Sequence, residues 1–388
     1  MHINSHKILP CILTAALIAV SAAGCGKSNT SVPESTTEAV IPDGLITIKN
    51  SDTDTDVSDA VEITLNGDSA SCDSSSVTIS ESEITINSEG SYVLNGSLDD
   101  GRIVIDADDA KVHLILNGVS IHSETSAAIY VKSADKTTIT LADGTDNTLS
   151  DSSNYTYDDA DKEEPDAVLF SKDDLSINGN GSLNIEASFN NGITCKNDLK
   201  IISGTINVSA KNNAIKGKDS LTVTGGTITA SADGKGLLSN NDEDEDKGYI
   251  HITGGTITLT CTDDTIHSNN AIYIEGGDLA LSSGDDGIHA DNTLVISGGT
   301  IDITKCYEGL ESAAISIDDG TISIAASDDG INAADGSSSS EGGPGMGGGP
   351  GMGENSDSNC SLTINGGTIY VNAGGDGIDS NGYIVMTG

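Results

Sequence analysis

The sequence lacks the residues that build an ordinary compact core and those that bind nucleic acid. Among 388 residues there is no tryptophan and there are only two phenylalanines. Medium-sized aliphatic side chains must therefore make up most of any core. Lysine and arginine together number 17, against 60 aspartates and glutamates, which leaves a formal net charge of −43. Phosphate backbones attract basic proteins, so this charge excludes a nucleic-acid partner.

Disulfide bonds are not expected either, although the chain contains seven cysteines. Cys11 lies in an apolar N-terminal run, and Cys25 follows it. An odd number of cysteines remains, without short spacings: Cys72, Cys195, Cys261, Cys306 and Cys360. Single thiols that pack as small hydrophobic groups explain this pattern best.

The N-terminal residues 1–24 have the pattern of a signal peptide, with a short basic start and an apolar run that is too short for a membrane span. "AAGC" at Ala22–Cys25 resembles a bacterial lipobox, which predicts lipidation of Cys25; an ordinary signal peptide cut near Ala23 is the alternative. Residues 25–57 then form a flexible tether. We expect an extracellular monomer, held by lipid at the outer face of the bacterial cytoplasmic membrane or cell surface.

A repeat organises the rest of the chain. The pairs Gly254-Gly255, Gly276-Gly277 and Gly298-Gly299 are each 22 residues apart, and aliphatic residues alternate with Thr, Ser or Asp between them. The pattern predicts an all-β fold, a single-stranded right-handed parallel β-helix with about 22 residues per rung. A helical solenoid would need a spacing of about 3.6 residues, a leucine-rich repeat would show its Leu-x-x-Leu-x-Leu register, and calcium-binding nonapeptide repeats would have a nine-residue period; none of these matches the sequence. The β-helix is expected over residues 58–388, with loop insertions at 150–166, 241–247 and 335–359.

Several segments in a fixed order carry a family resemblance: "VHLILNGVSI", "EEPDAVLFSKDDLSINGNGSLNI", the Asp-Asp-Gly-Ile rungs and a Gly-Gly-Pro-Gly-Met insertion. They resemble the bacterial exported carbohydrate-binding domain proteins, whose fold is similar to that of calcium-dependent pectate lyases. The resemblance covers roughly residues 60–388. It implies calcium within the solenoid and binding to cellulose and acidic plant polysaccharides such as polygalacturonate, without established lyase activity.

Carboxylates recur at one place in the rung. The predicted column contains Asp263, Asp264, Asp285, Asp286, Glu308, Asp328, Asp329 and Asp376. Equivalent positions on neighbouring rungs stack, and like charges so placed repel. From Gly225 to the end there are 26 acidic residues and three lysines, so we expect Ca²⁺, which takes six to eight oxygen ligands. Turn formation by Asp-Asp-Gly is the alternative.

His267 and His289 also stack one rung apart, close to the carboxylates. Two histidines are a weak zinc signal, and a solvent-exposed polar ladder is the interpretation that we favour. A lysine column runs through earlier rungs, with Lys172, Lys196 and Lys218 aligned and Lys216 nearby. It is either a stripe that meets sugar carboxylates or a solvated, salt-bridged face.

The leading prediction is a calcium-stabilised, non-catalytic domain that binds polysaccharide, either polygalacturonate or cellulose. A calcium-dependent pectate lyase is the first alternative, with Lys196, Lys218 or Lys305 as the base that removes a proton. A structural stalk or adhesin is the second, since most solenoids present such extended surfaces. No catalytic residue is assigned.

Overall fold

The computed structural model describes residues 39–42, 44, 45, 47–157, 163–334 and 360–388. They belong to one compact unit, Glu38–Gly388. Cys25, the signal peptide, the tether up to residue 38 and the insertion at 335–359 lie outside the described residues. Among the residues described, no helix has the length and apolar character needed to cross a bilayer.

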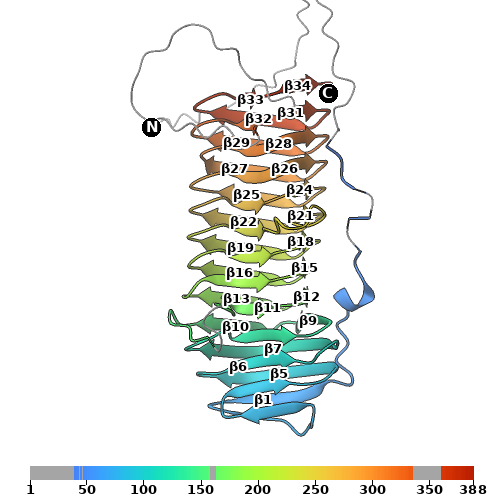
Figure 1. The fold of residues 1–388 in the computed structure, drawn as a ribbon, viewed down its shortest axis with the longest axis vertical. Coiled ribbons are helices and arrows are strands. Elements are labelled where there is room, and N and C mark those ends of the chain that lie inside the picture. The colour runs from blue at the N-terminus through green and yellow to red at the C-terminus, as the bar shows by residue number, and fades with distance from the viewer. Residues whose placement is uncertain (1–38, 43, 46, 158–162, 335–359) are drawn as a thin grey trace, which may run out of the picture. The chain divides into compact units, whose positions relative to one another are not determined.

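The described residues of this unit form 34 strands, nearly all paired in parallel with the strand one rung away. Figure 1 shows them stacked as successive coils, which confirms the predicted parallel β-helix. Each complete coil contributes to three sheets, which we name the first, second and third wall. The only antiparallel pairs among these strands are β1 with β2 and β3 with β4, at the N-terminal end.

The first wall contains the strands that precede the acidic turns. They are β1 (Val61–Gly67), β5 (Gly90–Leu98), β7 (Lys111–Ser123), β10 (Asp146–Asp151), β13 (Ser182–Ala187), β16 (Thr205–Ala210), β19 (Thr227–Ala232), β22 (Thr256–Cys261), β25 (Asp278–Ser282), β27 (Thr300–Cys306), β29 (Thr321–Ala326) and β32 (Thr368–Ala373). The short β2 (Ala70–Ser71) pairs with β1, whereas β3 (Val77–Ser80) pairs with β4 (Glu83–Ile86) of the second wall.

The second wall contains the strands that follow those turns. They are β4 (Glu83–Ile86), β6 (Arg102–Asp106), β8 (Ile129–Ser133), β11 (Ala167–Ser171), β14 (Asn191–Cys195), β17 (Ile215–Gly217), β20 (Leu237–Ser239), β23 (Ile266–Ser268), the first parts of β26 (Ile288–Ile296) and β28 (Leu310–Ile317), β30 (Ile331–Ala333) and β33 (Ile378–Ser380).

The third wall closes each coil. It contains the first part of β7, then β9 (Lys136–Leu141), β12 (Asp174–Gly179), β15 (Asp198–Ile201), β18 (Ser220–Val223), β21 (Tyr249–Ile252), β24 (Ala271–Ile274), the second parts of β26 and β28, β31 (Ser361–Ile364) and β34 (Tyr383–Met386).

Alternation explains why these segments become strands with one face inward. In β22 the side chains alternate strictly between exposed and buried, and Ile257, Leu259 and Cys261 point into the core. The register pairs Ile257 with Leu279 of the next rung, so aliphatic side chains stack in rows. Burying each such side chain contributes about 1.5–3 kcal/mol. Cys195, Cys261, Cys306 and Cys360 are buried, as expected, whereas Cys72 is only partly buried.

The second glycine of each Gly-Gly pair makes the turn into the first wall. Gly255 has φ +100°, where a side chain is strained, and a Cβ there would lie 3.2 Å from the carbonyl carbon of Gly225 in the rung below. Gly277 and Gly299 repeat this conformation at the same point of the coil. The 22-residue period therefore reflects a backbone requirement as well as the packing of the core.

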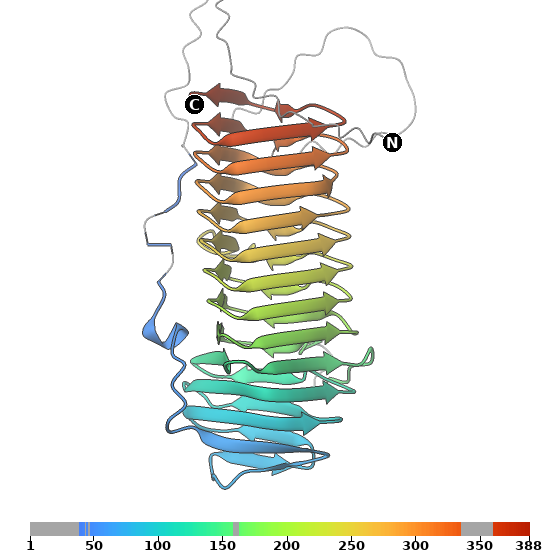
Figure 2. The ribbon, with the colours of Figure 1, turned by 180° about the vertical axis from the view of Figure 1, so that it is seen from behind.

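A segment that the sequence assigns to the tether lies along the third wall. We call residues 39–57 the strap, of which 43 and 46 are not described; Figure 2 shows it, in blue, beside the coils. It includes the short helix η1 (Asn50–Asp52). The buried Asp52 carboxylate contacts the ammonium groups of Lys136 and Lys200, and Ser176 Oγ donates to it at 2.8 Å. Part of the predicted tether is thus packed on the β-helix.

The other end of the strap covers apolar surface. Ile41 and Leu45 pack in a cluster with Tyr249 and Tyr273, and the Tyr249 hydroxyl donates to the Leu45 carbonyl at 3.2 Å. These two rings are therefore covered. In contrast, Tyr370 of the first wall is 66% exposed.

Candidate functional site

The turns between the first and second walls bring the predicted carboxylates together. We call this edge the carboxylate corner, with Asp264, Asp286, Glu308, Asp329 and Asp376 as its inner column and Asp263, Asp285 and Asp328 as its outer column. The Asp286 amide donates to Asp264 Oδ1 at 3.0 Å, and the Glu308 amide donates to Asp286 Oδ1 at 3.2 Å. These bonds join one rung to the next, so the inner carboxylates also act in the turns, as the turn alternative expects.

Lys235 adds a cation at the N-terminal end of this corner. It lies in the turn between β19 and β20, the position equivalent to Asp264 one rung earlier. Its Nζ contacts Asp264 Oδ2 at 2.5 Å and Asp263 Oδ1 at 3.0 Å. Lysines are too few in the C-terminal rungs to neutralise the carboxylate column as a whole. At this rung, however, Lys235 contacts both carboxylates.

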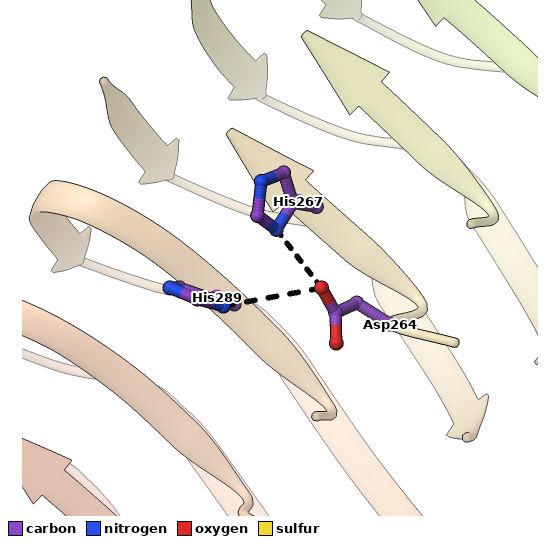
Figure 3. Close-up of side chains that lie close together, drawn as sticks. All are labelled: Asp264, His267 and His289. Carbon is purple, nitrogen blue, oxygen red and sulfur yellow. Dashed lines mark hydrogen bonds and ion pairs between the residues drawn. The ribbon is translucent and has the colours of Figure 1, made fainter. Parts of the chain in front are cut away.

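Two histidines and a glutamate from the second wall complete the site. In Figure 3, His267 and His289 both point toward Asp264. The His267 Nδ1 lies 2.9 Å and the His289 Nδ1 lies 3.9 Å from Asp264 Oδ2. The same His289 Nδ1 lies 3.5 Å from both Asp286 Oδ2 and Glu311 Oε2, while its Nε2 lies 3.6 Å from Asp291 Oδ1. The register pairs His267 with His289 and His289 with Glu311 on adjacent rungs.

The favoured interpretation of these histidines as a solvent-exposed ladder is wrong. Their side chains are only 13% and 24% exposed. Each ring packs against the other, with centroids 4.8 Å apart, and against the carboxylate of Asp264, which is almost fully buried. The acidic turn brings a charged partner to each ring, and this makes the partial burial of two polar rings tolerable.

The charges alter the proton affinities of these groups. Burial would raise the pKa of Asp264, but His267 and Lys235 outweigh it and hold that pKa well below its usual range. Burial would lower the pKa of His289, yet Asp286, Glu311 and Asp264 raise it to about 9. Burial and the contact with Asp286 raise the pKa of Glu311 to about 8. Folding therefore raises the proton affinity of both His289 and Glu311.

Three sets of side chains in the corner have ligand atoms close enough to share a metal ion. Asp263, Asp264 and Asp285 offer oxygen alone, and each ligand atom lies within 4.8 Å of the others. The sets Asp264–His267–His289 and Asp286–His289–Glu311 meet the same limit with mixed nitrogen and oxygen donors. Oxygen donors suit Ca²⁺, and imidazole suits transition metals such as zinc.

The remaining predicted carboxylates lie further along the same edge. Glu308 Oε2 accepts a hydrogen bond from Asn332 Nδ2 at 2.9 Å, and burial raises the pKa of Glu308. Asp328 is hydrogen-bonded by the Tyr307 hydroxyl. Asp329 Oδ1 accepts the Asp376 amide at 2.7 Å. These residues continue the stacked arrangement. Within the part of the chain that the structure describes, none of the four belongs to a set of side chains spaced as metal ligands.

The predicted lysines lie elsewhere on the second wall. Lys172, Lys196 and Lys218 follow successive strands at the edge facing the third wall, opposite the carboxylate corner. Lys196 Nζ lies 2.7 Å from Glu164 Oε1 and Lys172 Nζ 3.6 Å from Glu164 Oε2. Lys218 lies 3.4 Å from Glu243. This edge, which we call the lysine edge, is therefore salt-bridged by carboxylates from the inserted loops.

Lys216 is different from the other three lysines. It projects from β17 in the row that continues to Leu238 and His267. Burial lowers its pKa, while the nearby Asp166 opposes that shift. The structure therefore places the four lysines on neighbouring rungs but divides them between an edge and a wall.

Sequence reasoning missed two residues of the site. Lys235 lies 29 residues before Asp264 because the insertion 241–247 lengthens that rung, so the 22-residue period does not align them. Glu311 lies 22 residues after His289, so it aligns with the histidines and not with the Asp pairs. Both could be found by aligning the hydrophobic rows first and counting outward from Leu237, Ile266, Ile288 and Leu310.

Comparison with known proteins identifies the family of the chain. The family model of the carbohydrate-binding domain-containing proteins matches residues 80–330 and 268–346. A protein of Acetivibrio thermocellus described by that same name is 38% identical over 135 residues, which are 34% of this chain and 47% of the relative. The alignment thus spans about half the length of that curated relative.

A solved structure supports the same assignment. It is described as the polysaccharide lyase-like protein from C. thermocellum, in a gadolinium derivative. It has 40% sequence identity and a TM-score of 0.60, and the match covers 61% of this chain and 96% of that one. The family resemblance predicted from the sequence is confirmed: the chain belongs to the carbohydrate-binding domain-containing protein family.

Proposed function

We propose that the protein is a calcium-stabilised, non-catalytic domain that binds polysaccharide, either acidic pectin-like chains or cellulose, at the bacterial cell surface. The observation that carries this proposal is the carboxylate corner, where acidic side chains stack rung upon rung. Rungs of a parallel sheet repeat every ~4.8 Å. A regular row of anionic groups at that interval suits cations that bridge the protein to the carboxylates of an acidic polymer.

The donor chemistry of the corner fits calcium. Asp263, Asp264 and Asp285 present only oxygen, and Ca²⁺ completes a shell of six to eight ligands with carbonyls and water. The relative from C. thermocellum was prepared as a gadolinium derivative, and gadolinium is also a hard cation that prefers oxygen. Lys235 contacts two of these carboxylates, so a bound ion would use their other oxygens or displace the ammonium group. When bound, Ca²⁺ would neutralise the carboxylates and supply positive charge to a sugar carboxylate.

Pairing of the basic residues supports binding without catalysis. A lyase needs a base that can give up its proton near the operating pH, close to the substrate carbon. Lys196 and Lys218 contact Glu164 and Glu243 at the lysine edge, away from the carboxylate corner. Lys235 contacts two carboxylates, which raise its pKa above the usual value against the effect of burial. Lys305, on β27 beside the corner, is the residue on which the lyase alternative depends.

The N-terminal pattern completes the proposal. Lipidation at Cys25 would hold the domain at the outer face of the membrane, where extracellular polymers are accessible. Labelling the protein with a fatty-acid analogue in the bacterial host tests this, with Cys25→Ser as the control. Incorporation that does not depend on Cys25, or none at all, would remove the lipid anchor from the proposal.

Retention of the purified protein on polygalacturonate and on cellulose, in Ca²⁺ and then in chelator, tests the binding function. We expect retention on polygalacturonate that chelator abolishes. Asp285→Asn removes one exposed ligand. We expect retention of this variant to need about tenfold more Ca²⁺, since charged contacts contribute about 1.5–3 kcal/mol. Asp302→Asn, on the exposed face of the first wall, is the matched control and should bind as the unaltered protein does.

Ultraviolet absorbance of the same samples separates the alternatives. A lyase releases unsaturated uronate, which absorbs in the ultraviolet, whereas a binding domain leaves the polymer unchanged. Rising absorbance that Lys305→Met abolishes would replace this proposal with the lyase. Absence of retention on both polymers, with and without Ca²⁺, would leave a stalk or adhesin.

A further inference from the structure

A cleft lies on the second wall several rungs away from the carboxylate corner. It has a volume of about 270 Å³ and is lined by side chains of β4, β6 and β8 together with the chain before and after β11. Small-molecule sites begin at about 300 Å³. The size of this cleft therefore suits one sugar ring and not an extended segment of polymer.

Every charged side chain that lines the cleft has a partner of opposite charge, and Glu164 is shared between Lys172 and Lys196, which lies outside the lining. The cations of the lining are Arg102, Lys132 and Lys172, and its anions are Glu83, Asp106 and Glu164. They form three ion pairs. Arg102 Nη2 lies 2.6 Å from Glu83 Oε2, Lys132 Nζ lies 2.6 Å from Asp106 Oδ2, and Lys172 Nζ lies 3.6 Å from Glu164 Oε2.

The lining is also positioned before any ligand arrives. The Arg102 guanidinium donates from Nε to Glu83 at 2.7 Å and from Nη1 to Ser126 Oγ at 2.9 Å. Tyr130 packs edge-on against the buried Phe170, with ring centroids 5.7 Å apart, and Lys172 Nζ lies 5.7 Å from the centre of the Tyr130 ring. Side chains fixed in this way lose little conformational freedom on binding, which favours affinity.

Tyr130 also gives the cleft an apolar part, together with Val104 and Pro165. A pyranose ring has hydroxyl groups around its edge and C–H groups on its faces. Its hydroxyls both donate and accept hydrogen bonds, and ion pairs at the rim of a cleft offer strong donors and strong acceptors side by side. The apolar side chains can pack against the C–H face of the same ring.

We infer that this cleft is a subsite for a single neutral sugar unit, separate from the carboxylate corner. A uronate would compete with Glu83, Asp106 and Glu164 for cations that already have carboxylate partners. A neutral hexose leaves these ion pairs intact. The inference rests on the proposed polysaccharide-binding function, and it assigns neutral and acidic sugars to different parts of the second wall.

Calorimetric titration of the purified protein with cellotriose, a neutral glucose trisaccharide, and with trigalacturonate tests this. Both titrations are run in chelator, so that cations at the carboxylate corner do not contribute. Lys132→Gln removes one charged donor from the cleft. Lys111→Gln is the matched control, because Lys111 is similarly exposed and faces Asp135 outside the cleft. Circular dichroism of both variants establishes that they fold.

We expect cellotriose to bind, about tenfold more weakly to Lys132→Gln and equally to Lys111→Gln, since losing a charged hydrogen bond costs about 1.5 kcal/mol. Equal binding by the two variants, no binding of cellotriose, or a preference of the cleft for trigalacturonate would each overturn the inference. Calcium-dependent retention on polygalacturonate, tested separately, would then still stand for the carboxylate corner.

Discussion

The two edges of the second wall both place like charges on adjacent rungs, but the partners that offset those charges differ. At the lysine edge, inserted loops bring Glu164 and Glu243 to the lysines, so each cation has a carboxylate partner. At the carboxylate corner the excess charge is negative, and Lys235 is placed at one end of the column only. Beyond it, backbone amides donate to Asp264 and Asp286, and His289 lies between Asp286 and Glu311. Each lysine at the lysine edge thus contacts a carboxylate of the protein itself, with Lys172 and Lys196 sharing Glu164. The corner keeps an excess of negative charge, on which the proposed binding of further cations depends.

Among the substitutions that test this difference between the edges, removal of Lys235 should cause the largest loss of stability. Lys235→Met leaves the nearly buried Asp264 carboxylate without its ammonium partner, and breaking a buried pair in this way costs about 3 kcal/mol. We expect the free energy of unfolding, measured by urea denaturation in chelator, to fall by that amount. Calcium should restore part of it if the corner binds the ion.

Lys211→Met is the control for this measurement. Lys211 pairs with Asp233 on the neighbouring turn, where both side chains are more than half exposed. Exposed pairs contribute about 0–1 kcal/mol, so this variant should be nearly as stable as the unaltered protein. Equal losses in the two variants would show that the carboxylate corner does not depend on Lys235.

An intermediate effect is expected from pH. The folded protein binds protons at His289 and Glu311 more tightly than the unfolded chain does, because folding raises both pKa values, to about 9 and about 8. Their contribution to stability is therefore greatest at low pH and declines as the pH rises from about 5 to 9. In chelator, we expect the free energy of unfolding to fall by about 2 kcal/mol over that range, after allowing for solvent screening.

Glu311→Gln provides the matched test of that pH dependence. The amide cannot ionise, so the variant should be more stable than the unaltered protein near pH 9 and should show a flatter profile. An unchanged slope in thermal unfolding between pH 6 and pH 9 would assign the dependence to groups outside the corner.

The smallest effect is expected at the lysine edge. Lys218→Gln removes an ion pair whose glutamate partner is 78% exposed, and such pairs contribute little. We expect a change in unfolding free energy below about 0.5 kcal/mol by urea denaturation. A loss as large as that of Lys235→Met would mean that the two edges of the wall do not differ in the way described above.

The core of the fold could be predicted because its signal is local. Rows such as Ile193, Ile215, Leu237 and Ile266 follow from alternation and a nearly constant period, and the register pairs them as expected. The acidic turns could be found in the same way, since they lie at fixed offsets from those rows. Their partners were harder to predict, because Lys235 precedes an insertion and Glu311 belongs to the row of the histidines and not to the acidic turns. Partial burial of His267 depends on packing that a single sequence does not encode locally.

Packing of the strap on the β-helix could not be predicted either, and the composition of the strap explains why. Residues 47–57 are polar and lack alternation, which is typical of a linker. Their place in the structure depends on single contacts, such as Asp52 with Lys136, that join positions far apart in the chain. The sequence pattern does not predict this contact, because Asp52 and Lys136 are each ordinary charged residues in their own segments.

That strap also changes how the molecule folds. In a solenoid each coil contacts its neighbours alone, so folding can begin anywhere and spread. The strap joins Leu45 to Tyr249, 204 residues later in the chain, and it contacts Asn178 on a different coil. Contacts of such high sequence separation slow folding. We therefore expect docking of the strap to be a late step that requires several coils to have formed, and we expect those coils to unfold together.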